Sequence, residues 1–198
     1  MKKKILVACL CVALAVLTVA GTTLAYLTSK AEVKNTFTVG NVKITMDETD
    51  TDDSTRNAER DQANAYHLMP GGSYVKDPTV HVDPVSEDSW IFVKVENGIA
   101  SFEAANSNAE DGYKTIANQI TANGWIALDN VAGVYYKSYT KSTAGADLVV
   151  FSNFQISDTA NTVDGWNAIN TKNITVTAYA IQKAGFTTAA AAWAEVSK

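Results

Sequence analysis

The acidic stretch after residue 46 carries the densest set of groups that could do chemistry. Asp47, Glu48, Asp50, Asp52 and Asp53 fall close together in the chain, and carboxylate oxygens in such numbers suit Ca²⁺, which takes several oxygen ligands. The glycine and terminal glutamate of an EF-hand loop do not follow at the required spacing. The sequence therefore favours a solvated acidic loop over a calcium site. We expect no other metal and no cofactor.

The chain has two histidines, His67 and His81. Neither belongs to an H-E-x-x-H motif, in which a helix presents two zinc ligands on one face. His81 alternates with Val80 and Val82, so we expect it to face outward from a strand. No G-x-S-x-G, G-x-G-x-x-G or P-loop motif occurs. We therefore predict structural or solvated histidines and no catalytic residue, although a Ser-His-Asp triad assembled only in space stays open.

A group of tyrosines offers one further binding chemistry. Tyr135, Tyr136 and Tyr139 lie in a predicted strand. Exposed tyrosines could stack on sugars, but aromatic residues in strands more commonly form cross-strand packing pairs. We favour the packing interpretation.

The first residues have the composition of a secretory signal peptide. Three lysines at 2–4 precede an uncharged run at 5–20, and small residues precede a cut between Ala25 and Tyr26. The run is short for a membrane span, and no stop-transfer pattern follows. We therefore expect a signal peptide at residues 1–25, a secreted chain that begins at Tyr26, and no stable membrane anchor after cleavage.

Removal of this segment changes the chemistry available to the mature chain. It takes both cysteines, Cys9 and Cys11, and three lysines, which lowers the formal net charge from −5 to −8. A mature chain without thiols excludes a disulfide scaffold, a cysteine-ligated metal and a thiol nucleophile. Its acidic balance argues against nucleic acid or an anionic membrane surface as partner.

Apolar patterning predicts mostly strands. Residues 89–96 are apolar on both faces, as in a central strand, whereas residues 47–64 lack large apolar side chains and predict a long solvated loop. The predicted strands are residues 33–46, with a turn at Gly40-Asn41, then 78–83, 89–96, 124–128, 133–140, 147–156 and 173–182.

Helical spacing is confined to short segments. It predicts a helix at 111–122, one helical turn at 163–169, and a helix in the Ala-rich tail that docks through Trp193 and Val196. Because no strand–helix–strand alternation occurs, we predict an all-β fold at residues 41–198. It would be a single antiparallel, jelly-roll-like β-sandwich with short helical insertions and a C-terminal helix.

Three segments carry a family resemblance. The first is the signal junction with the run from Asn35-Thr36-Phe37 to Ile44. The second extends from Met69-Pro70-Gly71 to Val80, and the third from Ala178 to Trp193. Together they resemble the TasA/camelysin family of exported proteins of Gram-positive bacteria.

The resemblance implies a jelly-roll subunit of extracellular biofilm matrix fibres. Its signal would be cut by a SipW-type signal peptidase, and its mature N-terminal segment would add as a strand to the next subunit. The implied partners are copies of the chain itself, that peptidase and other matrix proteins, in the extracellular matrix or at the cell surface. Some family members are classed as metallopeptidases, a label that the sequence supports little.

Residues 26–40 are therefore the candidate donor strand. The stretch 26–39 is prone to extended structure and contains neither Pro nor Gly, and its large apolar residues are Tyr26, Leu27, Val33, Phe37 and Val39. A strand added to an open sheet edge pairs its main chain with that edge, and a head-to-tail contact propagates into a filament. Three alternatives remain: a first strand of its own domain, a secreted metallopeptidase, and a monomeric adhesin or carbohydrate-binding sandwich.

Overall fold

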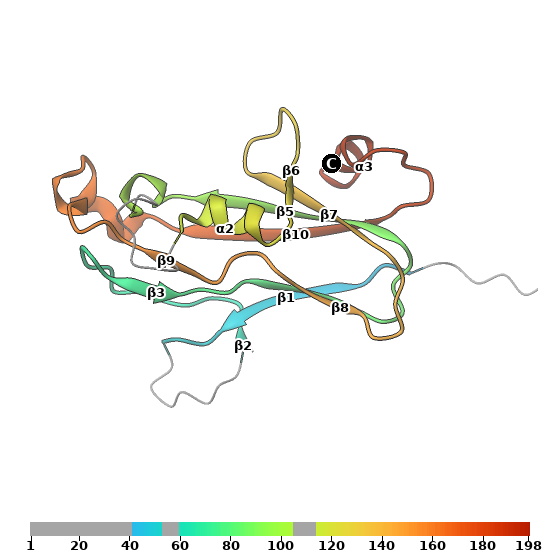
Figure 1. Ribbon diagram of the computed structural model, residues 1–198, viewed down its shortest axis with the longest axis horizontal. Coiled ribbons are helices and arrows are strands. Elements are labelled where there is room, and N and C mark those ends of the chain that lie inside the picture. The colour runs from blue at the N-terminus through green and yellow to red at the C-terminus, as the bar shows by residue number, and fades with distance from the viewer. Residues whose placement is uncertain (1–40, 53–59, 105–113) are drawn as a thin grey trace, which may run out of the picture. The chain divides into compact units, whose positions relative to one another are not determined.

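Antiparallel strands dominate the structure, a computed structural model that describes residues 41–52, 60–104 and 114–198 (Figure 1). These residues belong to one compact unit, and every strand pair among them is antiparallel. The prediction of an all-β fold with antiparallel sheets and few helices is confirmed. The predicted signal peptide, its cleavage site at Ala25 and Tyr26, and the candidate donor strand lie outside the described residues.

The first sheet is built around the central strand predicted at 89–96. Ile91, Val93 and Val95 on one face and Phe92 on the other are buried, so this strand is covered on both sides. It pairs along nine residues with its neighbour near the C-terminus. The strand order is β10 (Ile174–Gln182), β5 (Ser89–Asn97), β7 (Val134–Tyr139) and β6 (Ile126–Ala127).

The second layer contains the remaining strands. Its four-stranded sheet has the order β2 (Arg60–Asp61), β1 (Ile44–Thr49), β4 (Thr79–Val82) and β8 (Ala146–Val149). A two-stranded sheet joins β3 (Ser73–Val75) to β9 (Asn153–Gln155).

The predicted strand at 147–156 is in fact two strands, β8 and β9, and the break has a local cause. Val75 lies opposite Asn153 and Thr79 opposite Val149, so the ladder keeps one register across the gap. Pro78 has no N–H to give to this ladder. The N–H of Ser152 donates instead to Gln119 Oε1 at 3.0 Å. Two hydrogen bonds are thus missing from the ladder, and their absence separates β8 from β9 within one continuous pairing.

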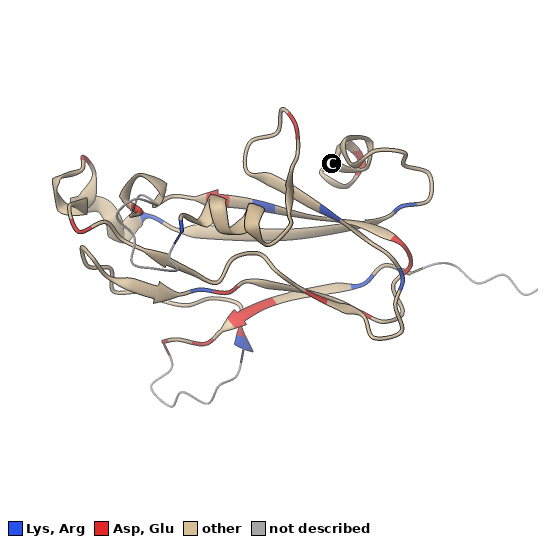
Figure 2. Ribbon diagram, viewed as in Figure 1, with Lys and Arg blue, Asp and Glu red and all other residues tan. Residues whose placement is uncertain are grey.

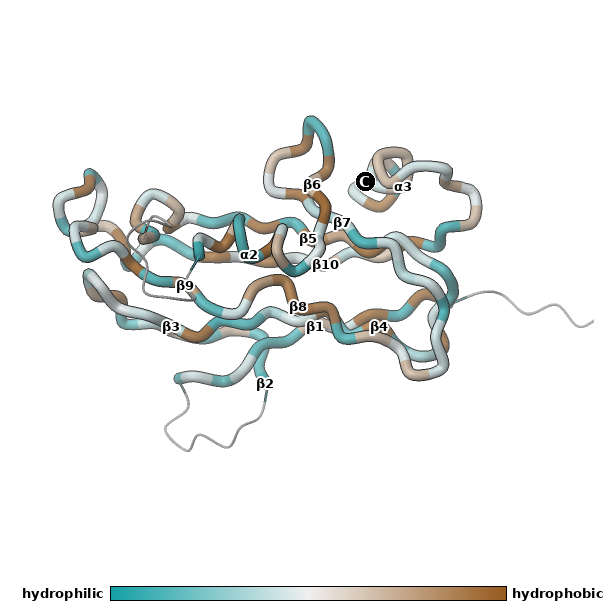
Figure 3. The backbone as a smooth tube through the Cα atoms, in the orientation of Figure 1, coloured by the Kyte–Doolittle hydropathy of each residue, from teal (hydrophilic) through white to brown (hydrophobic). Residues whose placement is uncertain are grey.

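The two layers share one hydrophobic core. Buried residues of both layers belong to one cluster, and Figure 3 shows apolar stretches in each of them. Burying each large side chain stabilises the fold by about 1.5–3 kcal/mol before entropy is counted. The largest fully buried residues are Trp125, Phe92, Phe102, Phe151 and Phe154.

A C-terminal helix covers the outer face of the first sheet (Figure 1). In this helix, α3 (Ala189–Val196), the Trp193 ring lies 5.3 Å from that of Phe92 and 5.2 Å from that of Tyr179. Thr188 caps the helix by accepting a hydrogen bond from the N–H of Ala191. Docking through Trp193 and Val196 is confirmed.

Three other helical segments are short. Helix α2 (Ile116–Ala122) ends at Asn123 and Gly124, where φ is +79°, as predicted; the predicted residues 111–113 lie outside the described chain. The 3-10 helices are η1 (Ala100–Phe102), η2 (Ala160–Thr162) and η3 (Trp166–Thr171). The last contains most of the turn predicted at 163–169.

The prediction of a solvated loop from residue 47 is wrong at its start. Strand β1 continues through Thr49, and Glu48 is only 4% exposed. The prediction assumed that the buried face of a strand must carry apolar side chains. Here an ion pair between Glu48 and Lys76 fills it instead.

Side chains in and after α2 cap the outer edge of β8 and β9. Gln119 Nε2 donates to the carbonyl of Asn153 at 2.8 Å, and Trp125 Nε1 donates to that of Val149 at 2.8 Å. Asn123 Nδ2 donates to the carbonyl of Val150 at 3.1 Å. The carbonyls of Val149 and Asn153, which point outward from this edge, are therefore occupied, whereas the carbonyl of Val150 lies on the side of Pro78, to which the N–H of Val150 donates.

We predict that Gln119→Leu lowers the free energy of unfolding by about 1–2 kcal/mol, because it removes partly buried hydrogen bonds to the main chain of Ser152 and Asn153. Urea denaturation measures this loss. Thr121→Ala, on the exposed side of the same helix, should change the free energy by less than about 0.5 kcal/mol. Equal effects of the two substitutions would show that the cap contributes nothing.

Candidate functional site

The outer edge of β10 is the most prominent unpaired feature of the described chain. At the two ends of the β5–β10 ladder, the N–H of Gly98 donates to the Asn173 carbonyl at 2.9 Å and the N–H of Lys183 donates to the Asp88 carbonyl at 2.7 Å. Bonding alternates along an antiparallel pair. The residues whose N–H and C=O groups point away from β5 are therefore Ile174, Val176, Ala178, Ala180 and Gln182.

Within the described residues, nothing covers these outward groups. Strand β10 is terminal in its sheet and pairs only with β5. By contrast, α2 caps β8 and β9, and the Tyr66 hydroxyl donates to the carbonyl of Val75 on β3 at 2.9 Å. A long, uncapped edge is a template for pairing with another strand.

A groove of about 950 Å³ lies beside the first half of this edge. One wall is β10, the opposite wall is β1 with residues 61–68, and Phe154 and Lys76 also line the space. Side chains from both layers thus surround one channel next to a free strand edge. The apolar lining residues include Met46, Tyr66, Leu68, Ile99, Ile174 and Val176.

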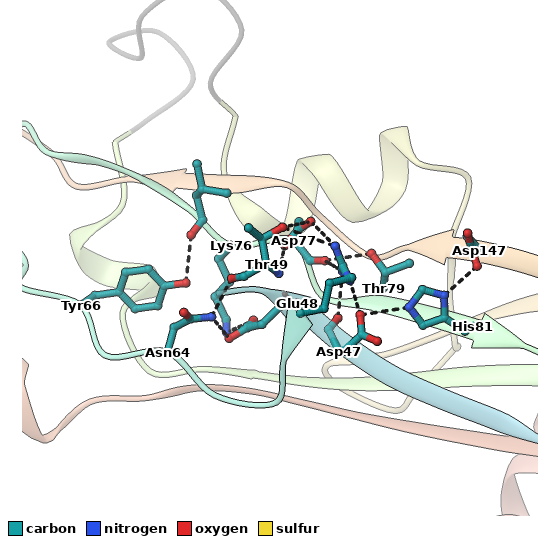
Figure 4. Close-up of polar contacts among 12 residues, drawn as sticks. Asp47, Glu48, Thr49, Asn64, Tyr66, Lys76, Asp77, Thr79, His81 and Asp147 are labelled. Atoms are coloured by element: carbon teal, nitrogen blue, oxygen red, sulfur yellow. Dashed lines mark hydrogen bonds and ion pairs between the residues drawn. The ribbon is translucent and has the colours of Figure 1, made fainter. Parts of the chain in front are cut away.

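A buried ion pair lines this groove (Figure 4). Lys76 Nζ lies 2.5 Å from Glu48 Oε2, and the two side chains are 10% and 5% exposed. Asn64 Nδ2 donates to Glu48 Oε1 at 2.9 Å. Because Ile44, Met46 and Glu48 share the inward face of β1, the carboxylate reaches the interior, where a cation must neutralise it.

The outer face of the same sheet carries a second charged cluster, where β1 runs beside β2 (Figure 2). Arg60 bonds to Asp47, and its Nη1 lies 3.0 Å from Asp77 Oδ2. Burial opposes ionisation of Asp47, but hydrogen bonds from Arg60 and His81 outweigh it and lower the pKa of this carboxyl group. The cluster holds the short strand β2 against β1.

His81 joins this cluster to the edge strand β8. Its Nε2 lies 3.0 Å from Asp47 Oδ1 and its Nδ1 lies 2.7 Å from Asp147 Oδ1. The hydrogen bond with Asp47 raises the pKa of the imidazole most, burial opposes it, and Asp147 adds to the rise. The ring faces outward, as alternation predicts, but it bridges two carboxylates instead of being solvated.

The predicted calcium candidates do not converge on one point. Asp47 and Glu48 lie on opposite faces of β1 and pair with different cations. Asp50 accepts a hydrogen bond from the N–H of Asp52, and Asp52 accepts one from the N–H of Ala65. Asp53 lies outside the described residues. In the part of the chain that is described, no three His, Cys, Asp or Glu side chains form a group that could hold a metal ion.

The remaining candidates have plain structural positions. His67 is exposed, on the rim of the groove. The ring of Tyr136 lies 5.8 Å from Trp90 and 6.2 Å from Phe92 on the neighbouring strand, and Tyr139 is buried. The cross-strand packing interpretation is confirmed for Tyr136. The polymerisation residues Tyr26, Leu27, Val33, Phe37 and Val39 lie outside the described residues.

Sequence reasoning missed the groove and its ion pair. Glu48 lies at the same alternating positions as Ile44 and Met46. This spacing could have predicted that Glu48 faces inward. Nothing local pointed to Lys76, to Arg60 or to Asp147, which are far from their partners in the chain.

Comparison of the chain with protein-family models, curated proteins and solved structures found no match. Among the described residues, no helix is long and apolar enough to cross a membrane.

The raised pKa of His81 predicts a pH-dependent stability. Its contribution should be complete below a pH of about 6.5, the unperturbed value, and should be lost as the pH rises through the higher pKa of the folded state. Because the ring is partly exposed, we expect a loss of at most about 1 kcal/mol. Denaturant unfolding from pH 5.5 to 9 measures it. His81→Gln should remove this dependence and His67→Gln should keep it; the reverse pattern would contradict the assignment.

The buried pair predicts an asymmetric response to substitution. Lys76→Met should lower the free energy of unfolding by about 3–5 kcal/mol, because Glu48 remains buried without a cation. Replacing both residues, with Glu48→Leu added, should restore most of that loss, since neither buried charge remains. Urea denaturation distinguishes the two variants. A double variant no more stable than Lys76→Met would mean that the pair contributes mainly through packing.

Proposed function

We propose that this chain is a secreted structural subunit of extracellular biofilm matrix fibres. Its signal peptide would be removed by a SipW-type signal peptidase, and the freed segment at residues 26–40 would add as a strand to the next copy. Other matrix proteins are proposed partners. On this interpretation the two sheets form a jelly-roll-like sandwich that exposes one edge for assembly.

The uncapped edge of β10 is the observation that carries this proposal. Side chains occupy the outward carbonyls of Val149 and Asn153 on the other long edge, at β8 and β9, whereas β10 offers five residues whose main-chain groups point outward, from Ile174 to Gln182. Two bonds per residue, at about 0.5–1.5 kcal/mol each, would contribute on the order of 5–15 kcal/mol before ordering is subtracted.

The candidate donor strand is long enough for this edge. Residues 26–39 span about 45 Å when extended, whereas the nine residues of β10 span about 30 Å. The donor lies at the N-terminus and the acceptor near the C-terminus, so the contact joins different surfaces of two copies. Such a contact need not close, and repetition produces a filament.

Cleavage would act as the switch for assembly. While residues 1–25 remain attached, the donor strand is held at the membrane by an apolar run. A mature chain without cysteine needs no oxidant to assemble outside the cell. The carboxylates of the outer charged cluster and of the groove are already paired with cations. They therefore give no support to the metallopeptidase alternative.

We predict that the chain beginning at Tyr26 forms filaments visible by electron microscopy and that Ala178→Pro abolishes them. Proline removes an outward N–H of β10 without removing a bond to β5, and an edge strand tolerates it. Ala178→Ser keeps the N–H and should form filaments normally.

A folded tag fused ahead of Tyr26 should also prevent assembly, because it obstructs the donor. Circular dichroism must show that each variant is folded. Normal filaments from folded Ala178→Pro would exclude β10 as the acceptor, and normal filaments from the tagged chain would exclude the donor strand.

A further inference from the structure

We infer that the donor strand of a second copy enters the groove beside β10 in a single register, with Asn35 against the buried ion pair of Glu48 and Lys76. This inference rests on the proposed function and specifies how the donor and the acceptor recognise each other.

The donor segment has one uncharged face. Residues of a strand alternate between its two faces, and all three charged residues from 27 to 39, Lys30, Glu32 and Lys34, fall at even positions. The odd positions are Leu27, Ser29, Ala31, Val33, Asn35, Phe37 and Val39. In an extended conformation the segment would therefore be amphipathic.

The groove requires the uncharged face. Paired residues on neighbouring strands point to the same face of a sheet, and Ile174, Val176 and Ala178 of β10 point into the core. The odd donor residues would thus enter the groove, and the charged even residues would remain in solvent. A shift of one residue would bury Lys30, Glu32 and Lys34 instead.

The ion pair gives the groove one polar position. Glu48 lines the same groove as Ile174 and Val176 of β10, and we place the donor residue that meets the ion pair beside Val176. A charged side chain there would have no free partner, because Lys76 and Glu48 neutralise each other. A side-chain amide can donate to the carboxylate and accept from the ammonium group.

Asn35 is the only inward donor residue with an amide. When it lies beside Val176, Val33 and Phe37 lie beside Ile174 and Ala178, whichever direction the donor runs. A shift of two residues would place an apolar side chain over the ion pair and leave the Asn35 amide unpaired, which is unfavourable in an apolar groove. The asparagine would thus fix the register, as single buried asparagines do in coiled coils.

The occupant is a second copy because of strand direction. Asn41 accepts a hydrogen bond from the N–H of Glu87, beside the end of β10 at Gln182. The chain's own leader would therefore run parallel to β10, whereas every described pair is antiparallel. The leader of another copy carries no such constraint and can pair in the antiparallel sense, which is the more stable of the two.

The test uses synthetic peptides of residues 26–39 to inhibit filament growth of the chain that begins at Tyr26, followed by light scattering. The peptide should occupy the groove and stop elongation. We expect that half-inhibition requires at least about tenfold more of the Asn35→Leu peptide, because its apolar side chain cannot bond to the charged pair. The Thr36→Leu peptide carries the same change on the opposite face and should inhibit as well as the unchanged peptide.

A second arm uses an acceptor without the ion pair. Against filaments of the chain that carries both Glu48→Leu and Lys76→Met, the Asn35→Leu peptide should match or exceed the unchanged peptide. Equal inhibition by the unchanged and Asn35→Leu peptides on the unsubstituted chain would overturn the register but leave strand donation intact. Absence of filaments, or no inhibition by any peptide, would overturn the proposed function itself. The first arm alone decides the matter if the double variant does not fold.

Discussion

The obligatory hydrogen bonding of the strand backbone organises this protein. Each main-chain N–H and C=O at a sheet edge must meet another strand, a side chain or water. Gln119 and Trp125 bond to outward carbonyls of the edge at β8 and β9, while β10 keeps its outward groups free within the described residues. That difference between two edges of one fold underlies the assembly account.

Charge placement reinforces the same division of surfaces. Arg60 and His81 hold the carboxylates of the outer cluster, so this face is stabilised without offering an empty ligand set. Inside the groove, Glu48 and Lys76 neutralise each other, which leaves a polar but uncharged recognition point among apolar side chains. The two clusters stem from one strand, β1, whose alternate residues face solvent and groove.

The sequence predicts the elements better than it predicts how they meet. The strand at 89–96 follows from a nearly continuous apolar run, the strand at 173–182 follows from the alternation of its two faces, and docking of the tail follows from Trp193. Local sequence patterns do not predict contacts between residues far apart in the chain. Such contacts determine the pairing register, the split between β8 and β9, and the partners of Lys76 and Asp147. Glu48 was misjudged because burial was sought only in apolar side chains, although its position two residues after Met46 placed it inward.

Residue-level hydrogen exchange on β10 tests the central claim most directly. In monomers, the amides of Val176, Ala178 and Ala180 should exchange rapidly while those of Thr177 and Tyr179, bonded to β5, are protected. In filaments, both sets should be protected, because a donor strand would occupy the outer edge. Rapid exchange of the first set in filaments, or its protection already in monomers, would contradict strand donation between copies at β10.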